Sequence, residues 1–558
     1  MGEEALVANG GDYGNPKPKA TLSLMVGVAM AVIGSSFQYG YNIAVVNAPA
    51  DEIKDFFFGP LEVEVINNTV VSSGNISTSS LNETIGSTTM SPDVSVKKEP
   101  VNDDHEIYRD NMYALAVSAF AFTGMIGSLL VGPVVRKFGR RGGLMVNNII
   151  SLVAAAFLGF SKLANSFPMI VIGRALIGVF AGLATGVVPM YIGEISPKEW
   201  RGAIGVLNQL LITIGILVAQ LFGLQGVMGT SEMWPWLFAF TAVPSILQMI
   251  SIPFMPKSPR YLLIDQHKED EARNVLVKLR GTDNVVNEMD DMRQEAESEA
   301  SAGQLTIVQL FRDRSVRWQL ITVLFLMVSQ QLSGINAVFF YSNKIFTNAG
   351  IPPGNQQDLA SVGVGTVNVL MTIVSVGIIE WAGRKSLLVW GFGMMIFWCI
   401  AMTVVLNLML AFGGWISYLS IACVIGYIVG FAIGPGPIPW LVTAELFRQA
   451  ARPPAFMISC MVNWGCNFII GISFPAVIKV TGPWVFLIFM VVCTCATVFL
   501  ALVLPETKGK TFNEISDLFA KRNGMKPGGA RRDESLKIPL KDMGVTADGS
   551  DPAAGDRV

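Results

Sequence analysis

Long apolar stretches separated by short polar segments dominate the chain. Each stretch has about 20 residues or more, which is the length an α-helix needs to cross the hydrocarbon core of a bilayer. The pattern predicts an all-α membrane protein with twelve transmembrane helices. They are expected at roughly 21–47, 113–135, 143–161, 167–190, 203–224, 232–254, 316–346, 358–380, 387–411, 415–443, 453–479 and 482–504.

The charged phrases between these stretches occur twice. Glu194–Arg201 and Glu445–Arg452 both begin with an acid, end with an arginine and follow a long apolar stretch. Paired membrane repeats are typical of proteins whose central site opens to either side when one half rocks against the other. We therefore expect two six-helix pseudo-repeats. Other pieces that recur are Gly139–Arg141 with Gly383–Lys385, and Pro256–Arg260 with Pro505–Gly509.

The distribution of basic residues predicts the orientation. Loops rich in Lys and Arg, such as those around Arg140 and Arg384, alternate with loops such as 225–233 and 347–357 that contain neither. The basic side of a membrane protein is usually cytoplasmic. Both termini are therefore expected in the cytoplasm, in a multi-pass protein of the plasma membrane.

The composition agrees with a membrane protein, and the order of apolar and polar segments divides the chain into five parts. Of the 558 residues 51% are hydrophobic and only 15% are charged. The net charge of −2 gives no reason to expect nucleic-acid binding. The expected segments are a cytoplasmic tail at 1–20, a first six-helix half at 21–254 with an extracellular loop at 48–112, cytoplasmic linker helices at 255–315, a second half at 316–504 and a cytoplasmic tail at 505–558.

The loop at 48–112 carries three sequons for N-glycosylation, at Asn67, Asn75 and Asn82. The six cysteines all lie in predicted membrane helices, where they are expected as apolar packing residues rather than disulfides. Only two histidines occur, and no Cys/His spacing or nucleotide-binding motif is found. We expect no metal, no cofactor and no enzymatic activity.

Neutral amides are the main polar side chains inside the predicted membrane helices. An amide offers both hydrogen-bond donors and acceptors, so it suits a ligand rich in hydroxyl groups without burying a charge. The alternative is that these amides join helices to one another. They are Gln38, Asn42, Gln209, Gln220, Gln330, Gln331, Asn336, Asn368, Asn463 and Asn467.

Two features predict moving parts. Gly434, Pro435, Gly436 and Pro437 interrupt the tenth stretch, where missing backbone donors predict an unwound hinge. The charged phrases are expected to form interhelical ion pairs at the cytoplasmic ends, which hold that side closed. The pairs considered are Glu194 with Arg201, Glu445 with Arg452, and Glu380 with Arg140 or Arg384.

Several of these motifs together resemble the sugar porters of the major facilitator superfamily, in particular the animal facilitative hexose transporters. The resemblance covers roughly residues 20–520 and implies a twelve-helix bundle that binds hexose between its halves. The motifs are Gln330–Tyr341, Gly434–Trp440, Gly173-Arg174, Pro256–Arg260 and Pro505–Gly509.

The resemblance also implies roles for individual residues. Sugar would contact Gln209, Ile212, Ile216, Gln330, Gln331, Asn336, Asn368, Trp440, Asn463, Trp464 and Asn467. A cytoplasmic charge network would comprise Arg140, Arg141, Arg174, Glu194, Arg201, Glu380, Arg384, Glu445 and Arg452. Phe340 and Tyr341 join the glycine–proline segment as gating candidates.

Departures from the family pattern bear on the substrate. Met327 stands where glucose-preferring members have Gln, and Ala432 where they have Glu, and both changes resemble the fructose-handling branch. Trp440 argues the other way, because that branch commonly has a small residue there. We expect facilitative transport of D-glucose by a monomer in the lipid bilayer, with fructose or both sugars as the alternative.

Two other functions were considered. A proton-coupled sugar symporter would carry an Asp in the first membrane helix, where this chain has Asn42, so uniport is favoured. A sugar sensor that does not transport would need a signalling module, and the residues beyond Phe519 are too few and show no periodic pattern.

Overall fold

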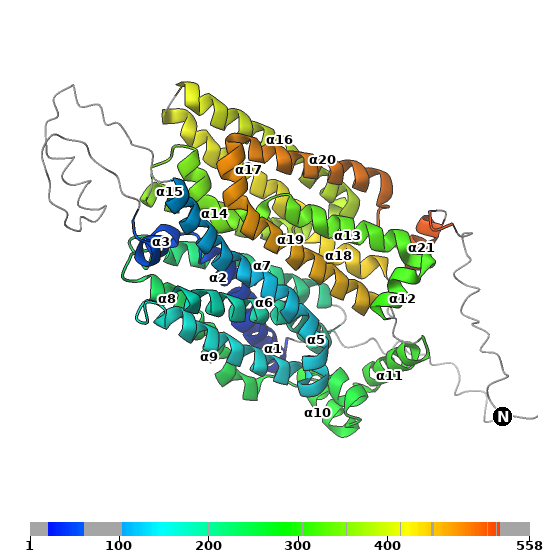
Figure 1. Cartoon of the computed structure of the whole chain (residues 1–558). Helices are drawn as coiled ribbons and strands as arrows, with labels where there is room; N and C mark the ends of the chain where they lie inside the picture. The colour runs from blue at the N-terminus through cyan, green and yellow to red at the C-terminus, as the bar shows by residue number, and fades with distance from the viewer. Residues whose placement is uncertain are drawn as a thin grey trace, which may run out of the picture.

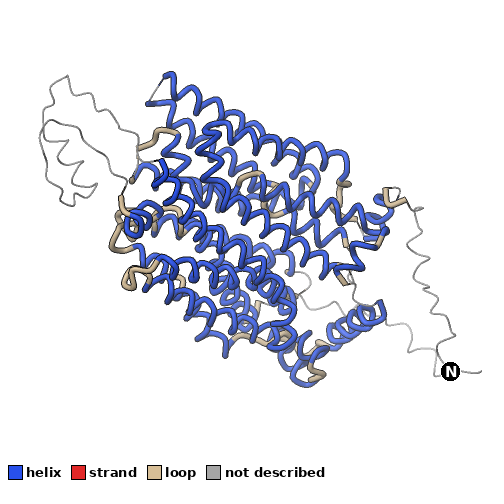
Figure 2. The backbone as a smooth tube through the Cα atoms, in the orientation of Figure 1, coloured by secondary structure: helices blue, strands red, loops and turns tan. Residues whose placement is uncertain are grey.

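The computed structural model describes residues 20–60, 103–197, 200–302, 306–352, 354–412, 414–447, 451–510, 512–520 and 522–524. Within them every regular element is a helix (Figure 2). The sequons at Asn67, Asn75 and Asn82 lie outside the described residues.

The α-helices of the described residues are α1 (Leu22–Ala31), α2 (Gln38–Ala44), α3 (Ala50–Phe58), α5 (Asp103–Phe160), α6 (Phe167–Ile195), α7 (Arg201–Phe222), α8 (Trp234–Ala239), α9 (Ala242–Ser251), α10 (Glu269–Arg280), α11 (Val286–Ala302), α12 (Ile307–Arg312), α13 (Arg317–Leu332), α14 (Ile335–Asn348), α15 (Asn355–Ala382), α16 (Arg384–Phe412), α17 (Ser417–Ile433), α18 (Ile438–Leu446), α19 (Arg452–Thr481), α20 (Val485–Val503) and α21 (Phe512–Ala520). Short 3-10 or π segments are η1 (Val32–Phe37), η2 (Ile252–Phe254), η3 (Tyr261–Asp265), η4 (Arg314–Val316), η5 (Gly414–Ile416) and η6 (Gly482–Trp484).

Ten segments of the described chain are long and apolar enough to cross a membrane. Two of them, Asp104–Phe160 and Arg452–Val503, contain 57 and 52 residues. At 1.5 Å per residue each is about 80 Å long, more than twice the roughly 30 Å hydrocarbon core. The first bends at Gly139, whose φ is 69°, and the second is divided at η6. The ten segments are thus compatible with the twelve expected crossings.

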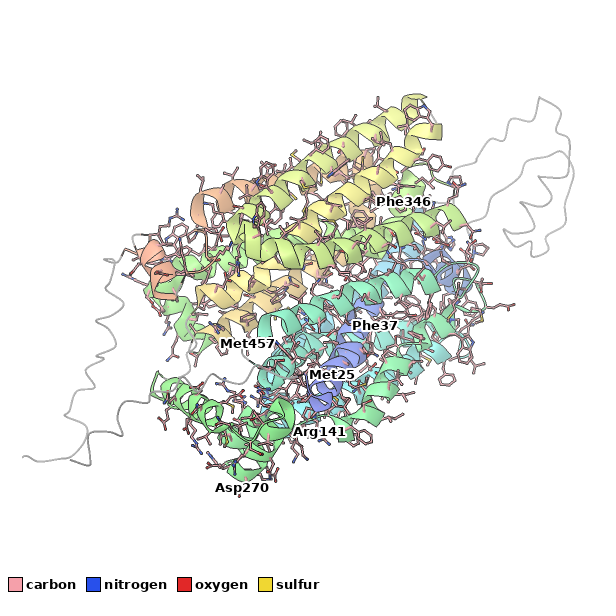
Figure 3. All side chains as sticks on the ribbon, turned by 180° about the vertical axis from the view of Figure 1, so that it is seen from behind. Met25, Phe37, Arg141, Asp270, Phe346 and Met457 are labelled. Carbon is pink, nitrogen blue, oxygen red and sulfur yellow. The ribbon has the colours of Figure 1, made fainter. Side chains whose placement is uncertain are left out.

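The membrane helices form two groups (Figure 1). We call α1 to α9 the first half and α13 to α20 the second half. Across their contact α5 packs on α19, and α7 packs on α15. The helices α10 and α11 lie at one end of the bundle, here called the linker end, and α3 lies at the opposite end, here called the loop end. In Figure 3, Arg141 and Asp270 mark the linker end and Phe346 marks the loop end.

Glycine allows very close contact between α2 and α7. A Cβ on Gly40 would lie 1.9 Å from the carbonyl oxygen of Ile212, and one on Gly215 would lie 2.1 Å from that of Phe37. Only a residue without a side chain fits at such distances, which is the usual way in which membrane helices approach closely. The crossing fixes the position of α7, which carries Gln209, Ile212 and Ile216.

Candidate functional site

The helix expected at 415–443 is broken where the glycine–proline segment lies. Helix α17 ends at Ile433 and α18 begins at Ile438, with Gly434 at φ −133° and ψ −69° between them. A Cβ on Gly434 would lie 2.2 Å from the carbonyl oxygen of Leu387, so glycine is required by the close approach to α16. The predicted break is confirmed.

Gln330 on α13 satisfies the backbone that this break exposes. Its Nε2 donates to the carbonyl oxygens of Pro435, at 2.7 Å, and Gly436, at 2.9 Å. Its Oε1 accepts a hydrogen bond of 2.8 Å from Nδ2 of Asn463 on α19. Three helices therefore meet through one amide, and the side chain of Gln330 is 3% exposed.

Gln331 belongs to a second amide pair. Its Oε1 accepts from Nδ2 of Asn336 on α14, across the turn where Gly334 adopts φ 98°. Both side chains are buried, with exposed fractions of 8% and 7%. The neighbouring amides thus form two separate pairs, Gln330 with Asn463 and Gln331 with Asn336.

Helix α19 presents Asn463 and Asn467 one turn apart, hence on the same face. The Oδ1 of Asn467 is buried without a hydrogen-bond partner among the described residues. A buried acceptor left unpaired costs about 1–3 kcal/mol. A ligand hydroxyl at this position would remove that cost. Met327 lies beside the same face, with its sulfur 3.9 Å from Nδ2 of Asn463.

Trp464 packs between the two halves. Its ring centroid lies 5.6 Å from those of Tyr39 and Phe120, both in the first half. A Cβ on Gly124 would lie 2.5 Å from the indole, so α5 has a glycine where the ring sits. Trp464 therefore contacts the half that does not carry it.

The remaining candidates lie on three more helices, α7, α15 and α18. Asn368 is buried on α15, which packs on α7 with its residues Gln209, Ile212 and Ile216. Ile216 is buried, while Gln209 and Ile212 are half-buried. Trp440 on α18 is also half-buried and stacks on Phe456, with centroids 6.3 Å apart and planes at 16°.

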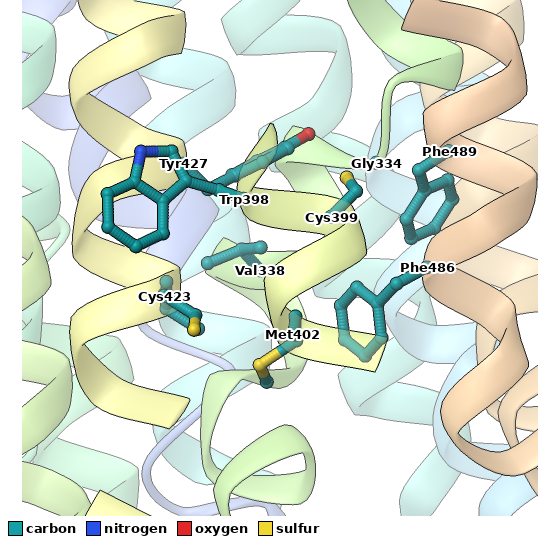
Figure 4. A pocket seen from close by; sticks show the side chains of 10 residues that line it. Gly334, Val338, Trp398, Cys399, Met402, Cys423, Tyr427, Phe486 and Phe489 are labelled. Atoms are coloured by element: carbon teal, nitrogen blue, oxygen red, sulfur yellow. The ribbon is translucent and has the colours of Figure 1, made fainter. Parts of the chain in front are cut away.

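A small cavity of about 20 Å³ lies elsewhere in the second half, between α14, α16, α17 and α20 (Figure 4). Apolar, aromatic and cysteine side chains line it, including Trp398, Met402 and Phe489. Its one hydroxyl, on Tyr427, donates to the carbonyl of Ser333 at 2.7 Å. No amide or charged residue lines it, so this cavity does not suit a hydroxyl-rich ligand.

At the linker end, each half holds the same charged arrangement. In the first half, Arg140 pairs with Glu194 at 2.8 Å, and the hydroxyl of Ser258 donates to the same carboxylate. In the second half, Arg384 pairs with Glu445 at 3.1 Å, and Thr507 donates to that carboxylate at 2.5 Å. An internal duplication would produce such a match.

Both carboxylates bind arginines of the expected network, although the pairing of Glu445 with Arg452 is not found among the described residues. Glu194 and Glu445 bind Arg140 and Arg384 of their own halves, so the pairs do not connect the halves in this structure. Arg452 donates to the carbonyl of Phe447 at 3.5 Å. The other expected members are placed as follows: Arg141 donates to the carbonyl of Met255 at 3.2 Å, and the side chains of Arg201 and Glu380 lie outside the described part of the chain.

Arg174 does not belong to the charge network at the linker end. It precedes Glu194 by 20 residues of α6, which corresponds to about 30 Å along the helix. Its guanidinium is fully buried, donates to the carbonyl of Asn42 at 2.8 Å and lies 4.5 Å from the ring centroid of Phe120. The expectation was wrong, because the motif it rested on carries no information about depth.

At the loop end, hydrogen bonds connect the two halves. The amide of Asn47 donates to Ser342 at 2.8 Å and to the side chain of Asn343 at 3.1 Å, and the backbone N–H of Asn343 donates back at 3.2 Å. The gating candidates lie next to them: Phe340 is buried, and Tyr341, at a kink in α14, donates to the carbonyl of Gly471 at 2.7 Å.

Ion pairs reinforce the same end. Asp110 on α5 binds Lys54 at 3.2 Å and also pairs with Lys344 of the second half, while Glu106 lies 3.6 Å from Lys479. Burial opposes the charged form of Lys54, but Asp51 and Asp110 outweigh it and raise the pKa of this ammonium group. Sequence reasoning missed these residues. The available signal was Lys344, a charge within a predicted membrane helix, which is costly unless paired.

Comparison with known proteins identifies the family. The model of the family described as "Sugar (and other) transporter" matches residues 27–519. The chain belongs to this sugar transporter family. It is 42% identical over 528 residues to "Solute carrier family 2, facilitated glucose transporter member 5" of Homo sapiens, covering 95% of this chain and 98% of that protein. It is 40% identical over 509 residues to "facilitated glucose transporter member 7" of Mus musculus, covering 90% and 91%.

Comparison with solved structures finds the same fold in a sugar transporter. "Partially occluded inward open conformation of the xylose transporter XylE from E. coli" matches with a TM-score of 0.69, covering 88% of this chain and 99% of that one at 20% sequence identity. A structure of the same symporter bound to 6-bromo-6-deoxy-D-glucose matches with a TM-score of 0.67 at 22% identity. The protein is therefore a multi-pass membrane transporter with the major facilitator fold, and it is not an enzyme.

Proposed function

We propose that the protein carries a hexose across the plasma membrane by facilitated, uncoupled transport. The amide group around the α17–α18 break is the observation that carries this proposal. Asn463 and Asn467 offer polar groups to the hydroxyls of a ligand, and Gln330 holds Asn463 where three helices of the second half meet. The first half contributes α7 and the aromatic residues that contact Trp464.

The environment of Met327 supports fructose ahead of D-glucose as the substrate. Met327 is fully buried and its thioether, a weak acceptor only, faces Asn463 in a place where an amide would offer two donors and an acceptor. The relatives member 5 and member 7 are both named facilitated glucose transporters. D-glucose therefore remains the alternative, supported by Trp440 as a broad aromatic surface for a pyranose ring.

Asn42 supports uniport over proton coupling. Its Nδ2 donates to the carbonyl of Gln38 at 2.9 Å, and its Oδ1 lies 3.4 Å from the hydroxyl of Thr241. An amide in this buried position cannot carry a proton across the membrane. Transport by this route runs down the hexose gradient and stops at equal concentrations.

Alternating access is supported by the polar contacts between the halves, which in the described residues gather at the loop end. The inter-half bonds at Asn47 and Asp110 would close the loop end, while the described charged pairs at the linker end lie within single halves. With the linker end in the cytoplasm, as the basic loops indicate, this conformation would face inward. Each monomer contains both halves and would transport alone.

Counter-flow in proteoliposomes tests the proposal. Vesicles loaded with unlabelled hexose should take up labelled fructose, and an excess of outside fructose should compete more strongly than D-glucose. Net uptake should stop at the outside concentration whether or not a pH gradient is imposed. Accumulation driven by protons would exclude uniport, and stronger competition by D-glucose would reverse the order of the two sugars.

A further inference from the structure

An open cleft of about 340 Å³ lies where the second half begins, at the linker end. Three arginines line one part of it, Arg312, Arg314 and Arg317. Apolar side chains line the rest, namely Phe311, Leu320, Ile321 and Leu324. None of these residues belongs to the amide group or to the charged arrangements described above.

The arginines form a local excess of positive charge. All three are exposed, and none makes an ion pair or hydrogen bond within the described part of the chain. Asp313 is the one carboxylate between Phe311 and Leu324, and its side chain accepts from the N–H of Ser315 at 2.7 Å. The start of α13 is already capped, because Asn523 accepts from the N–H of Trp318 at 3.0 Å. The attraction for an anion therefore comes from the guanidinium groups.

The apolar part runs along the membrane helix. Arg317, Ile321 and Leu324 follow helical spacing, so they share one face of α13. Ile321 is 38% exposed and Phe311 is 54% exposed. The apolar span that contains this helix begins at Arg314. Cations thus lie at the membrane boundary, and an accessible apolar strip continues from them into the hydrocarbon region.

We propose that this cleft binds one anionic phospholipid. The arginines bind the phosphate, for which guanidinium geometry is well suited, and an acyl chain lies along Ile321 and Leu324. A soluble anion would use the arginines but gain nothing from the apolar strip. The acyl chain of a zwitterionic lipid would also contact the apolar strip, but the cationic group of its headgroup would be repelled by the arginines. Charge and apolar strip together select an anionic lipid of the leaflet at the linker end.

Native mass spectrometry of the full chain in detergent micelles tests this site. Dioctanoyl phosphatidylglycerol, dioctanoyl phosphatidylcholine and inorganic phosphate are titrated separately. We expect one phosphatidylglycerol to be retained preferentially. The Arg314→Gln/Arg317→Gln variant should bind it at least about tenfold more weakly, since each basic residue near the surface contributes substantially to attraction of anionic lipid.

Arg273→Gln/Lys278→Gln is the matched control, because it removes two exposed charges from α10 without touching the cleft. It should bind phosphatidylglycerol like the wild type. Arg312→Gln alone provides a milder variant should the double variant unfold at a lower temperature. The proposal would be overturned if phosphatidylcholine or inorganic phosphate were retained as well as phosphatidylglycerol. It would also be overturned if the control variant lost as much phosphatidylglycerol binding as the Arg314→Gln/Arg317→Gln variant.

Discussion

Gln330 and Gln331 are neighbours in the chain but have different partners. Gln330 bonds to the backbone of the α17–α18 break and to Asn463, whereas Gln331 bonds to Asn336 alone among the described contacts. A ligand can replace Asn336 as the partner of Gln331 without exposing backbone. Gln330 is therefore tied to the α17–α18 break, whereas we propose Gln331 as an amide that binds the substrate.

Gln331→Leu should weaken hexose binding. The substitution removes one partner of a buried hydrogen bond, which costs on the order of 1–3 kcal/mol. Binding of labelled hexose to the purified variant measures the change. Asn407→Leu is the control, because the described bond of that amide goes to the carbonyl of Thr403 in its own helix. Wild-type affinity in a Gln331→Leu variant that reaches the membrane would assign Gln331 to helix packing.

Trp440→Ala should lower uptake of D-glucose more than uptake of fructose. The indole is expected to cover the apolar face of a pyranose ring, a contact worth roughly 0.5–1.5 kcal/mol beyond the area it buries. Parallel uptake of both sugars measures the ratio. The control is Trp390→Ala, since Trp390 is 72% exposed on the surface of α16. Equal loss for both sugars would mean that Trp440 supports the hinge through its stacking on Phe456.

At the scale of elements, two breaks shape the candidate site. Gly334 separates α13 from α14, and the glycine–proline segment separates α17 from α18. Inside a membrane such breaks persist only where other groups satisfy the freed backbone. Gln330 satisfies the backbone at the second break, so this break depends on a side chain of another helix.

Gln330→Leu should destabilise the protein more than Gln331→Leu does. It leaves the carbonyls of Pro435 and Gly436 and the amide of Asn463 without their described partner, and each buried unsatisfied group costs about 1–3 kcal/mol. Thermal unfolding in the same detergent measures both variants, which differ only in the position of one substitution. Equal unfolding temperatures would show that water or another group satisfies the break.

At the scale of the whole molecule, polar bonds between the halves gather at the loop end in the described residues. Asn47 bonds to Ser342 and Asn343, and Asp110 pairs with Lys344. At the linker end the described charged pairs remain within one half. The balance between the two conformations should therefore respond to the charges at the loop end.

Asp110→Asn should shift the protein towards conformations that are open at the loop end. The change removes the carboxylate that lies between Lys54 and Lys344, while keeping the shape of the side chain. Distances between spin labels at Tyr108→Cys and Thr347→Cys, in a background without the native cysteines, should gain a longer component. Asp51→Asn is the control, because Asp51 is exposed and pairs with Lys54 inside α3. The same shift in both variants would exclude a specific role for the link to Lys344.

The sequence by itself determined the membrane class, the long apolar helices, the break in the tenth stretch and the supply of neutral amides. Each of these depends on local properties: the length of an apolar run, the missing N–H of proline, or the chemistry of one side chain. The family also followed from motifs in order along the chain. None of this requires knowing which helices are neighbours.

Only the tertiary structure decided which side chains pair through ion pairs and hydrogen bonds. Glu445 and Arg452 belong to one phrase, yet Glu445 binds Arg384 from another helix. Arg174 was assigned to the wrong end, and the bonds of Asn47 and Asp110 to the second half were not foreseen. Ion pairs and hydrogen bonds act over a few ångströms, so they depend on how helices far apart in the chain are rotated and packed. A single sequence does not specify that packing, whereas the folded bundle does.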